Sequence, residues 1–140
     1  MNRKIKFRVW DKYKKQMYPI SSIDFDIFSL EIRIIAVGLE NGMCTAYNKN
    51  HNSEKCDITA LELMQYTELH DKTGKEIYEG DIVKITGSKE IDIGKVIYEY
   101  NGFIVDVMNM DRFYGRVHLL EKFTEVIGNI YEDSELLGGE

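Results

Sequence analysis

Apolar and polar residues alternate strictly at the start of the chain, between residues 4 and 10. A period of two is typical of a half-buried β-strand, because successive side chains point to opposite faces. One face is apolar and comprises Ile5, Phe7 and Val9. The other face is basic or aromatic and comprises Lys4, Lys6, Arg8 and Trp10. The pattern therefore predicts a strand with one face in the core and a basic stripe toward solvent.

Further short strands are predicted in the first half of the chain, at residues 16–20, 23–28 and 32–37. Asp11–Lys15 is expected to form the turn before the first of them. Pro19 would place that strand at the edge of a sheet or would lie at a strand end, because proline cannot donate a hydrogen bond to a ladder. Asn41-Gly42 is typical of a tight hairpin, and the polar window from Tyr47 to Asp57 predicts a long surface loop. We therefore expect an N-terminal β region over residues 1–60.

The stretch from Leu63 to Ile85 contains two turn signals, at residues 71–74 and 78–81. Each combines an aspartate, which can accept hydrogen bonds from its own turn, with a glycine that allows a positive φ angle. We interpret the carboxylates of this stretch as turn-forming rather than catalytic. The segment 59–69 leaves two interpretations open. Thr59 begins a helical capping box with a glutamate three residues on, whereas the run that follows is compatible with a strand.

The strongest hairpin signal is Asn101-Gly102, between the apolar segments 95–100 and 103–108. A two-residue loop would pair apolar and aromatic side chains on one face, namely Tyr100 with Phe103, Tyr98 with Val105, and Val96 with Val107. We expect that face to lie in the core. A loop is expected at Met110–Gly115, a strand or helical turn at Val117–Phe123, and a last strand at Glu125–Tyr131.

Four or five short strands joined by tight turns in roughly fifty residues are typical of a small SH3-like barrel. The predicted fold class is therefore mainly β with minor α. It combines N-terminal antiparallel strands in residues 1–60 with an SH3-like β-barrel in residues 61–140, in one compact unit.

The chain has 140 residues, of which 44% are hydrophobic, which is sufficient for one core. The net charge of −6 opposes binding to phosphate backbones on average. Residues 1–15, however, carry seven basic groups and one acidic group, a local sum of +6 that leaves −12 for the remainder. A secretory signal and an apolar stretch of roughly 20 residues are both missing from the sequence. We therefore expect a cytoplasmic protein without membrane contact.

Catalytic and metal-binding patterns are weak in this sequence. The residues with metal-ligand character are Cys44, His51, Cys56 and His70, whose spacings of seven, five and fourteen match no compact zinc pattern. Nucleophile turns of the Gly-x-Ser-x-Gly type and phosphate-binding glycine patterns are also missing. We therefore predict no metal site, no cofactor, no small-molecule substrate and no enzymatic activity.

Two interpretations of the basic stripe remain open. Lys4, Lys6 and Arg8 could contact phosphates while Trp10 stacks on a base, as in proteins that bind single-stranded nucleic acid. Alternatively, the stripe is solvated or pairs with the acidic remainder of the protein or with a protein partner.

Three segments together resemble the YopX family of phage and prophage proteins. They are Lys6–Asp11 with Lys14–Tyr18, Leu63–Thr67 through Lys75–Val83, and Glu125–Glu132 with Glu135–Leu137. Glu68 and His70 depart from the family pattern, in which Gly and Lys are expected. The resemblance implies a small, mostly β accessory protein that acts in the host bacterial cytoplasm. The family has no established activity, so no catalytic residue is transferred. Our leading hypothesis is a binding module that contacts a protein partner or self-associates, and the alternative is nucleic-acid binding.

Overall fold

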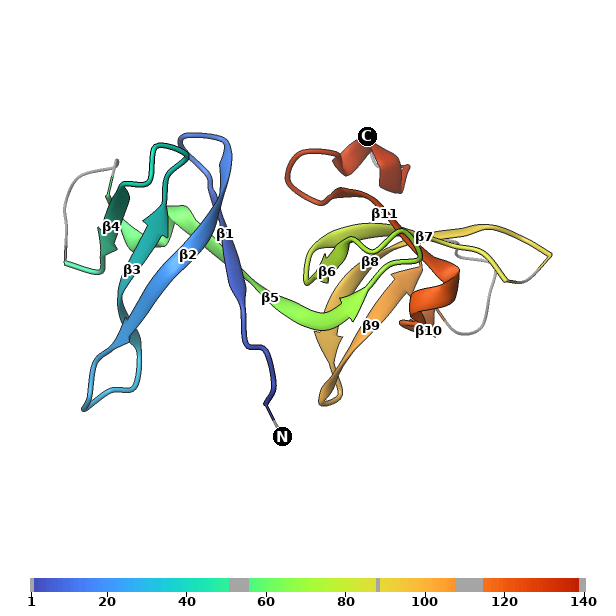
Figure 1. Ribbon diagram of the computed structural model, residues 1–140, viewed down its shortest axis with the longest axis horizontal. Coiled ribbons are helices and arrows are strands. Elements are labelled where there is room, and N and C mark those ends of the chain that lie inside the picture. Colours follow the sequence, from blue (N-terminus) through green and yellow to red (C-terminus); the bar gives the residue numbers. More distant parts are fainter. Residues whose placement is uncertain (1, 51–55, 88, 108–114, 139–140) are drawn as a thin grey trace. The chain divides into compact units, whose positions relative to one another are not determined.

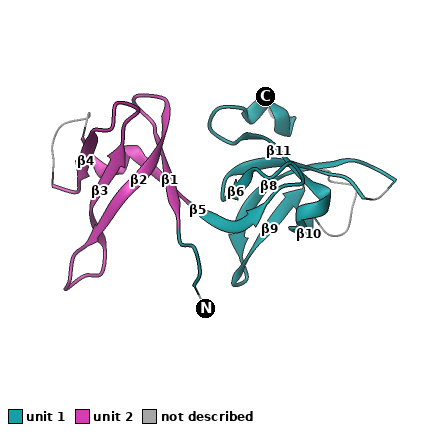
Figure 2. Ribbon diagram, viewed as in Figure 1, with its two compact units in different colours: residues 1–5, 65–140 teal, residues 6–64 magenta. Residues whose placement is uncertain are grey.

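The computed structural model describes residues 2–50, 56–87, 89–107 and 115–138 (Figure 1). The fold is mainly β, as predicted, and its helical turns are short 3-10 turns. The chain forms two compact units (Figure 2). One unit comprises residues 6–64, here called the N-terminal unit. The other comprises residues 1–5 and 65–140, here called the C-terminal unit.

The N-terminal unit is an antiparallel sheet with the strand order β4-β3-β2-β1-β5. The strand bounds are Phe7–Asp11 for β1, Gln16–Phe25 for β2, Ile32–Gly38 for β3, Cys44–Asn48 for β4 and Leu61–His70 for β5. Only the first part of β5 belongs to this unit. A buried cluster fills its core: Val9, Tyr18, Ile35, Val37 and Tyr47. Ile35 and Val37 are two positions apart along β3, as expected for a strand with one buried face.

Asn41-Gly42 lies in the tight connection between β3 and β4, as the sequence predicts, and Gly42 has a φ angle of +78°. The predicted polar loop begins later than expected. Tyr47 lies in β4 and is fully buried, so its assignment to a surface loop is wrong. The sequence did not indicate that Tyr47 lies in a strand. Its neighbours are polar, and the alternation along a short strand covers too few residues to be recognised. Residues 51–55 of that loop lie outside the described residues.

Pro19 was predicted to lie at a sheet edge or a strand end, but it lies within β2, which is an internal strand. The ladder between β2 and β3 begins at Ile20, which pairs with Val37. Pro19 is therefore next to the end of that ladder. Proline has no N–H to donate to a ladder, and this is tolerated at the end of a ladder as it is at a strand end.

Segment 59–69 contains both a helical turn and a strand, the two structures that the sequence left open. A 3-10 turn, η1 (Ile58–Ala60), precedes β5, so the segment is a short turn followed by a strand. The turn is capped by Asp57, whose side chain accepts a hydrogen bond from the Thr59 N–H at 2.9 Å. The capping box that Thr59 would have started is therefore absent.

The C-terminal unit contains an antiparallel sheet with the order β10-β9-β8-β7-β11, and β6 pairs with the second part of β5. The bounds are Glu76–Tyr78 for β6, Asp81–Ile85 for β7, Asp92–Glu99 for β8, Gly102–Val107 for β9, Arg116–His118 for β10 and Thr124–Asn129 for β11. The 3-10 turns η2 (Glu121–Phe123) and η3 (Ser134–Leu137) complete the unit. Its similarity to an SH3-like barrel stays a prediction.

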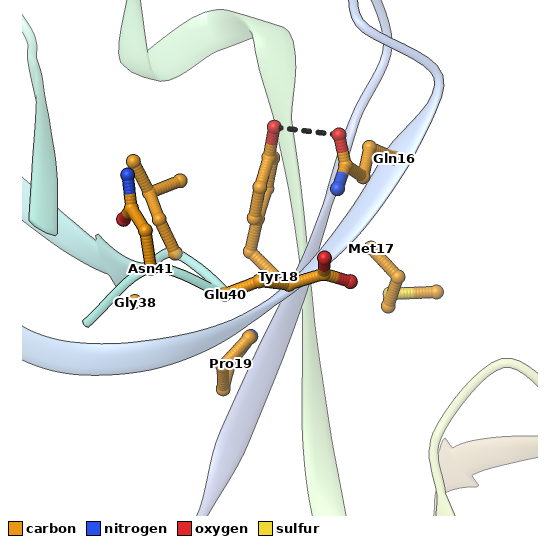
Figure 3. A pocket seen from close by; sticks show the side chains of 8 residues that line it. Gln16, Met17, Tyr18, Pro19, Gly38, Glu40 and Asn41 are labelled. Carbon is orange, nitrogen blue, oxygen red and sulfur yellow. Dashed lines mark hydrogen bonds between the residues drawn. The ribbon is translucent and has the colours of Figure 1, made fainter. Parts of the chain in front are cut away.

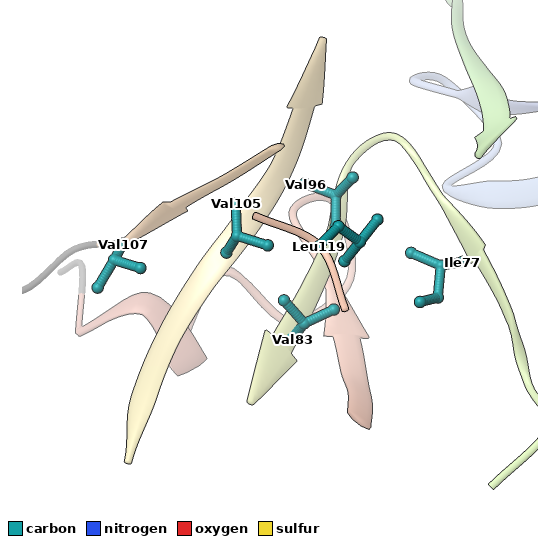
Figure 4. Close-up of a cluster of buried hydrophobic side chains, with 6 residues drawn as sticks. All are labelled: Ile77, Val83, Val96, Val105, Val107 and Leu119. Carbon is teal, nitrogen blue, oxygen red and sulfur yellow. The ribbon is translucent and has the colours of Figure 1, made fainter. Parts of the chain in front are cut away.

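Six buried side chains form the core of the C-terminal unit (Figure 4): Ile77, Val83, Val96, Val105, Val107 and Leu119. They come from β6, β7, β8, β9 and the residue that follows β10. The last predicted strand is confirmed as β11, and segment 117–123 forms the end of β10 and η2. The loop predicted at 110–115 lies outside the described residues except for Gly115.

The β8–β9 hairpin is confirmed, but its register differs by two residues from the prediction. Tyr98 pairs with Phe103, and Val96 pairs with Val105. The reason is that Tyr100 and Asn101 occupy the loop with φ angles of +53° and +65°, whereas Gly102 already begins β9. A two-residue loop of this handedness needs positive φ at both central positions. A shift of two residues keeps the same residues on each face, so Val96 and Val105 remain in the core.

The aromatic end of that face is not buried as expected. Tyr98 is 56% exposed and Tyr100 is 83% exposed. Tyr98 packs edge-on against Phe103, with ring centroids 5.2 Å apart. The predicted core therefore extends only as far as the valines, because the hairpin continues beyond the strands that cover it.

Candidate interaction surface

The four residues of the predicted basic stripe lie in two different units of the structure. Lys4 precedes β1, is exposed and belongs to the C-terminal unit, whereas Lys6, Arg8 and Trp10 belong to the N-terminal unit. Lys6 and Arg8 are half-buried. Contact of Lys4, Lys6 and Arg8 with nucleic acid stays a prediction.

Trp10 is only 6% exposed, so the prediction that it lies on the solvent face is wrong. The last three residues of β1 are all buried, which shows that both faces of the strand are covered at this end. The strand is internal in its sheet, between β2 and β5. Trp10 is consequently a packing residue, and its ring is not available to stack on a base.

Asp11, at the end of β1, is 1% exposed and organises the turn that follows. Its Oδ1 accepts hydrogen bonds from the N–H groups of Tyr13 and Lys14, each at 2.9 Å. Its Oδ2 accepts the hydroxyl proton of Tyr47 at 2.6 Å. Burial, followed by the bond to Asp11, raises the pKa of Tyr47 well above its ordinary value. The carboxylate therefore ties the β1–β2 turn to β4.

Asp71 and Asp81 have equivalent roles in the C-terminal unit. Both are buried, with exposures of 5% and 1%. Oδ1 of Asp71 accepts hydrogen bonds from the backbone N–H groups of Thr73 and Lys75, and Oδ2 of Asp81 accepts one from Tyr78. Gly74 and Gly80 have the positive φ angles that the two turns require. These two carboxylates of segment 63–85 therefore form turns.

Candidate metal ligands are not gathered in the described part of the chain, where no three His, Cys, Asp or Glu side chains could hold a metal ion. Cys44 is exposed and Cys56 half-buried, and both are free thiols. His51 lies outside the described residues. No helix formed by the described residues is long and apolar enough to span a bilayer.

A shallow hollow of about 540 Å³ lies between the first part of β2 and the β3–β4 turn (Figure 3). Its lining is mixed in polarity: Gln16, Met17, Tyr18, Pro19, Gly38, Leu39, Glu40 and Asn41. The Tyr18 hydroxyl donates to Oε1 of Gln16 at 3.0 Å, so the polar group nearest the core is already bonded. Burial, then the nearby Asp11 charge, raises the pKa of Tyr18. The hollow offers no convergent set of polar groups for a ligand.

The β2–β3 connection exposes several large apolar side chains to solvent. We call residues 25–31 the apolar tip; it projects from the end of the hairpin (Figure 1). Phe28 is 91% exposed, Ile27 80%, Leu30 76% and Phe25 50%. Four large apolar side chains gathered in one short connection are typical of an interaction site rather than of an ordinary surface.

The backbone of the apolar tip is held in one conformation by Asp26. Oδ1 of Asp26 accepts the N–H groups of Phe28 and Ser29, each at 2.9 Å, and its carbonyl accepts that of Leu30 at 2.8 Å. These backbone bonds lower the pKa of Asp26. The Glu31 N–H donates to the Ser29 hydroxyl at 3.3 Å. The tip therefore presents its apolar side chains from a preorganised turn, which lowers the entropy lost on binding.

Sequence reasoning missed the apolar tip because it assigned segment 23–28 to a strand. β2 in fact ends at Phe25, and the next apolar residues stand in the turn. The signal that could have found it is Asp26 followed by Ser29, a pair that caps a turn in the middle of an apolar run. When a turn lies within an apolar run, the apolar side chains of that turn are exposed to solvent.

The description of the YopX protein family matches residues 6–138 of the chain. The chain belongs to the YopX family. Two solved structures of the same fold cover nearly the whole chain. Protein EF1440 from Enterococcus faecalis is 26% identical, covers 97% of this chain and 99% of its own, and superposes with a TM-score of 0.66. Protein yopX from Bacillus subtilis is 23% identical, covers 94% and 97%, and has a TM-score of 0.62. No curated protein matches significantly.

Each of the three segments on which the sequence-based resemblance rested contains a buried residue that forms a turn. Asp11 ends the first segment, and Asp81 lies in the second. In the third segment, Asn129 Oδ1 accepts the N–H groups of Tyr131 and Glu132, both at 3.0 Å. These three residues therefore have structural roles in turns of this chain.

Glu68 has an unusual backbone conformation for a residue with a side chain. Its φ angle is +70°, and the register between β5 and β6 shifts between Tyr66 and His70. Glycine adopts such an angle without strain. The Glu68 side chain forms an exposed ion pair with Arg3, at 3.0 Å. A side chain at this position therefore introduces backbone strain into the irregular part of the β5–β6 ladder.

We predict that Glu68→Gly stabilises the protein relative to Glu68→Ala by about 1 kcal/mol. Both changes remove the ion pair with Arg3, which at an exposed site contributes only ~0–1 kcal/mol. Only the glycine also removes the strain of a left-handed backbone, which is about 1 kcal/mol for a residue with a Cβ. Urea unfolding of the two variants measures this difference directly. Equal stabilities would show that the positive φ angle at residue 68 is not strained.

Proposed function

We propose that this YopX protein is a non-enzymatic binding module that contacts a protein partner through the apolar tip. The observation that carries the proposal is the exposure of Phe28, Ile27 and Leu30 on a turn whose backbone N–H groups are bonded. Exposed apolar area on a rigid turn contributes to binding and loses little conformational entropy. Phe28 is the natural anchor of such a contact, because aromatic side chains dominate binding energy at protein interfaces.

The charges around the apolar tip favour a protein over a membrane. Three carboxylates lie in or beside the tip, on Asp24, Asp26 and Glu31, against the two cations Arg33 and Lys49. Arg33 is paired with Asp24, and Lys49 with Glu31. Peripheral membrane insertion usually combines apolar side chains with an excess of Lys and Arg, which anionic lipids attract. The tip has a slight excess of negative charge instead.

Membership of the YopX family supports a biological setting for this module. Together with the resemblance of the sequence to phage and prophage proteins, it favours an accessory protein encoded by a phage and acting in the host bacterial cytoplasm. The buried aspartates support the absence of catalysis in this proposal, since their oxygens accept backbone N–H bonds within turns.

We predict that Phe28→Asp weakens partner binding by at least about 30-fold, because it removes an apolar anchor and places a charge in the contact. The tagged protein is used to capture partners from host cells, and the captured proteins are identified and quantified by mass spectrometry. Tyr13→Asp is the matched control, since Tyr13 is 60% exposed in the same unit but outside the tip. Proteins captured equally by wild type and Phe28→Asp would contradict the proposal.

A further inference from the structure

Two hairpin turns that the proposed function does not use contain an Asn-Gly pair. Asn41-Gly42 lies between β3 and β4, and Asn101-Gly102 lies at the β8–β9 connection. Asparagine is among the thermally labile residues. A following glycine increases this lability, because no Cβ shields its backbone nitrogen from the asparagine side chain. The two turns are therefore candidate sites of deamidation.

Deamidation is a balanced reaction whose only co-reactant is water. The glycine N–H loses its proton to a solvent base, and its nitrogen forms a bond to Cγ of the asparagine. The bond between Cγ and Nδ2 breaks, and Nδ2 leaves as ammonia after it takes up a proton. Water then opens the cyclic imide at either carbonyl, which gives aspartate or isoaspartate. The first step needs a side chain that can rotate toward the glycine nitrogen.

The side chain of Asn41 is exposed but held by its own hairpin. Its Oδ1 accepts a hydrogen bond from the Met43 N–H at 3.1 Å. The Gly42 N–H donates to the Leu39 carbonyl at 3.0 Å, and the Leu39 N–H donates to the Met43 carbonyl at 2.7 Å. Rotation of Cγ toward the Gly42 nitrogen therefore has to strain or break the bond to Met43. This local network opposes the attack.

Asn101 is exposed in the β8–β9 turn, where its φ angle is +65°. Among the described residues, its side chain takes part in no hydrogen bond or ion pair. Asn101 and Gly102 line the same hollow of about 390 Å³, together with Arg3, Gln65, Glu79, Tyr98 and Phe103. A Cβ at Gly102 would meet no atom within 4 Å. Solvent therefore reaches both reacting residues, and the imide has room to form.

We propose that Asn101 is a deamidation site of this protein, whereas the fold protects Asn41 although it has the same following residue. The glycine nitrogens are similarly placed, because Gly102 pairs with Glu99 across its turn as Gly42 bonds to Leu39 across the other. The difference lies in the side-chain bond of Asn41. One hydrogen bond corresponds to a rate difference of roughly 5-fold.

The product changes the turn in two ways. Isoaspartate inserts a methylene group into the backbone between β8 and β9, whose register depends on a short loop. Either product also adds a negative charge to the hollow that Arg3 lines. The modification is independent of the apolar tip, since it takes place in the C-terminal unit.

The experiment follows both asparagines in one sample. The folded full-length protein is incubated at mildly alkaline pH, and tandem mass spectrometry of its peptides measures the conversion of each amide to an acid. A second sample is incubated in urea, where the chain is unfolded and neither Asn-Gly pair is restrained. We expect Asn101 to react roughly 5-fold faster than Asn41 in the folded protein, and at a similar rate in urea.

Gly102→Ala is the matched variant, because its Cβ has space in the fold but crowds the approach of the nitrogen to Cγ. Conversion of Asn101 should fall to the level of Asn48, which no glycine follows, while that of Asn41 stays unchanged. Equal rates for Asn41 and Asn101 in the folded protein, or a difference that persists in urea, would overturn the proposal. So would a rate at Asn101 that Gly102→Ala leaves unchanged. Circular dichroism confirms that the variant is folded.

Discussion

Replacing Asp71 by alanine is expected to destabilise the protein by about 3 kcal/mol. One oxygen of Asp71 accepts the N–H groups of Thr73 and Lys75, and the other accepts the N–H of Val126 in β11 at 2.9 Å. Asp71 is 5% exposed, so its removal leaves the N–H of the partly buried Val126 without its acceptor in the interior. Each buried donor without an acceptor costs ~1–3 kcal/mol. The long-range bond to Val126 distinguishes this residue from an ordinary turn aspartate.

Urea unfolding measures the loss, and hydrogen exchange at the Val126 amide locates it, since that N–H is expected to become unprotected in Asp71→Ala. The matched control is Asp26→Ala, which also removes a carboxylate that accepts two successive turn N–H groups, but from a partly exposed loop. We expect a much smaller loss there. Equal losses in the two variants would show that burial and the bond to Val126 add nothing to the local turn.

The pKa of Asp71 makes the same residue a determinant of acid stability. Burial raises this pKa, but hydrogen bonds from the Thr73 hydroxyl and from the N–H groups of Val126, Lys75 and Thr73 outweigh burial and hold it at about 2. The ordinary value is 3.8. Because the folded pKa is the lower one, the stabilisation is complete above pH 4 and is lost as the pH falls toward 2. A shift of this size corresponds to about 2 kcal/mol. The Asp71→Ala variant should lack this part of the acid dependence.

Replacing Gly94 by alanine is expected to destabilise the protein by about 3 kcal/mol, although the change removes no polar side-chain group. Gly94 lies in β8 and pairs with Val83 of β7 and with Val107 of β9. A Cβ at this position would lie less than 3.0 Å from the carbonyl group of Asp106 and from a methyl group of Val105. Two of the three nearest atoms are backbone atoms, so β9 must move away from β8. Overpacking of this kind costs ~1–3 kcal/mol or more.

Gly102→Ala is the control for this prediction, because a Cβ at Gly102 would meet no atom within 4 Å. Gly102 begins β9 of the same hairpin, and its stability change should stay within about 0.5 kcal/mol. Thermal and urea unfolding of both variants provide the comparison. If Gly94→Ala were as stable as Gly102→Ala, the close approach of β8 and β9 at this position would be incorrect.

Local chemistry made several features predictable from the sequence. The aspartate–glycine turns at 71–74 and 78–81, the Asn41-Gly42 turn and the β8–β9 hairpin depend on residues a few positions apart. Turn-forming aspartates and glycines act through their own neighbours, so their pattern can be read along the chain. The same holds for the mainly β class, which follows from alternation and from short spacing between turns.

Tertiary structure decided the features that depend on what covers a residue. Alternation placed Trp10 beside Lys6 and Arg8, but an internal strand can be covered on both faces, and Trp10 is buried. An apolar run gave no indication that β2 ends at Phe25 and that Phe28 stands in solvent. The sequence determined the turns because their hydrogen bonds are local. Only the fold decided which apolar and aromatic side chains are buried and which are exposed to solvent, because burial is set by residues far away in the chain.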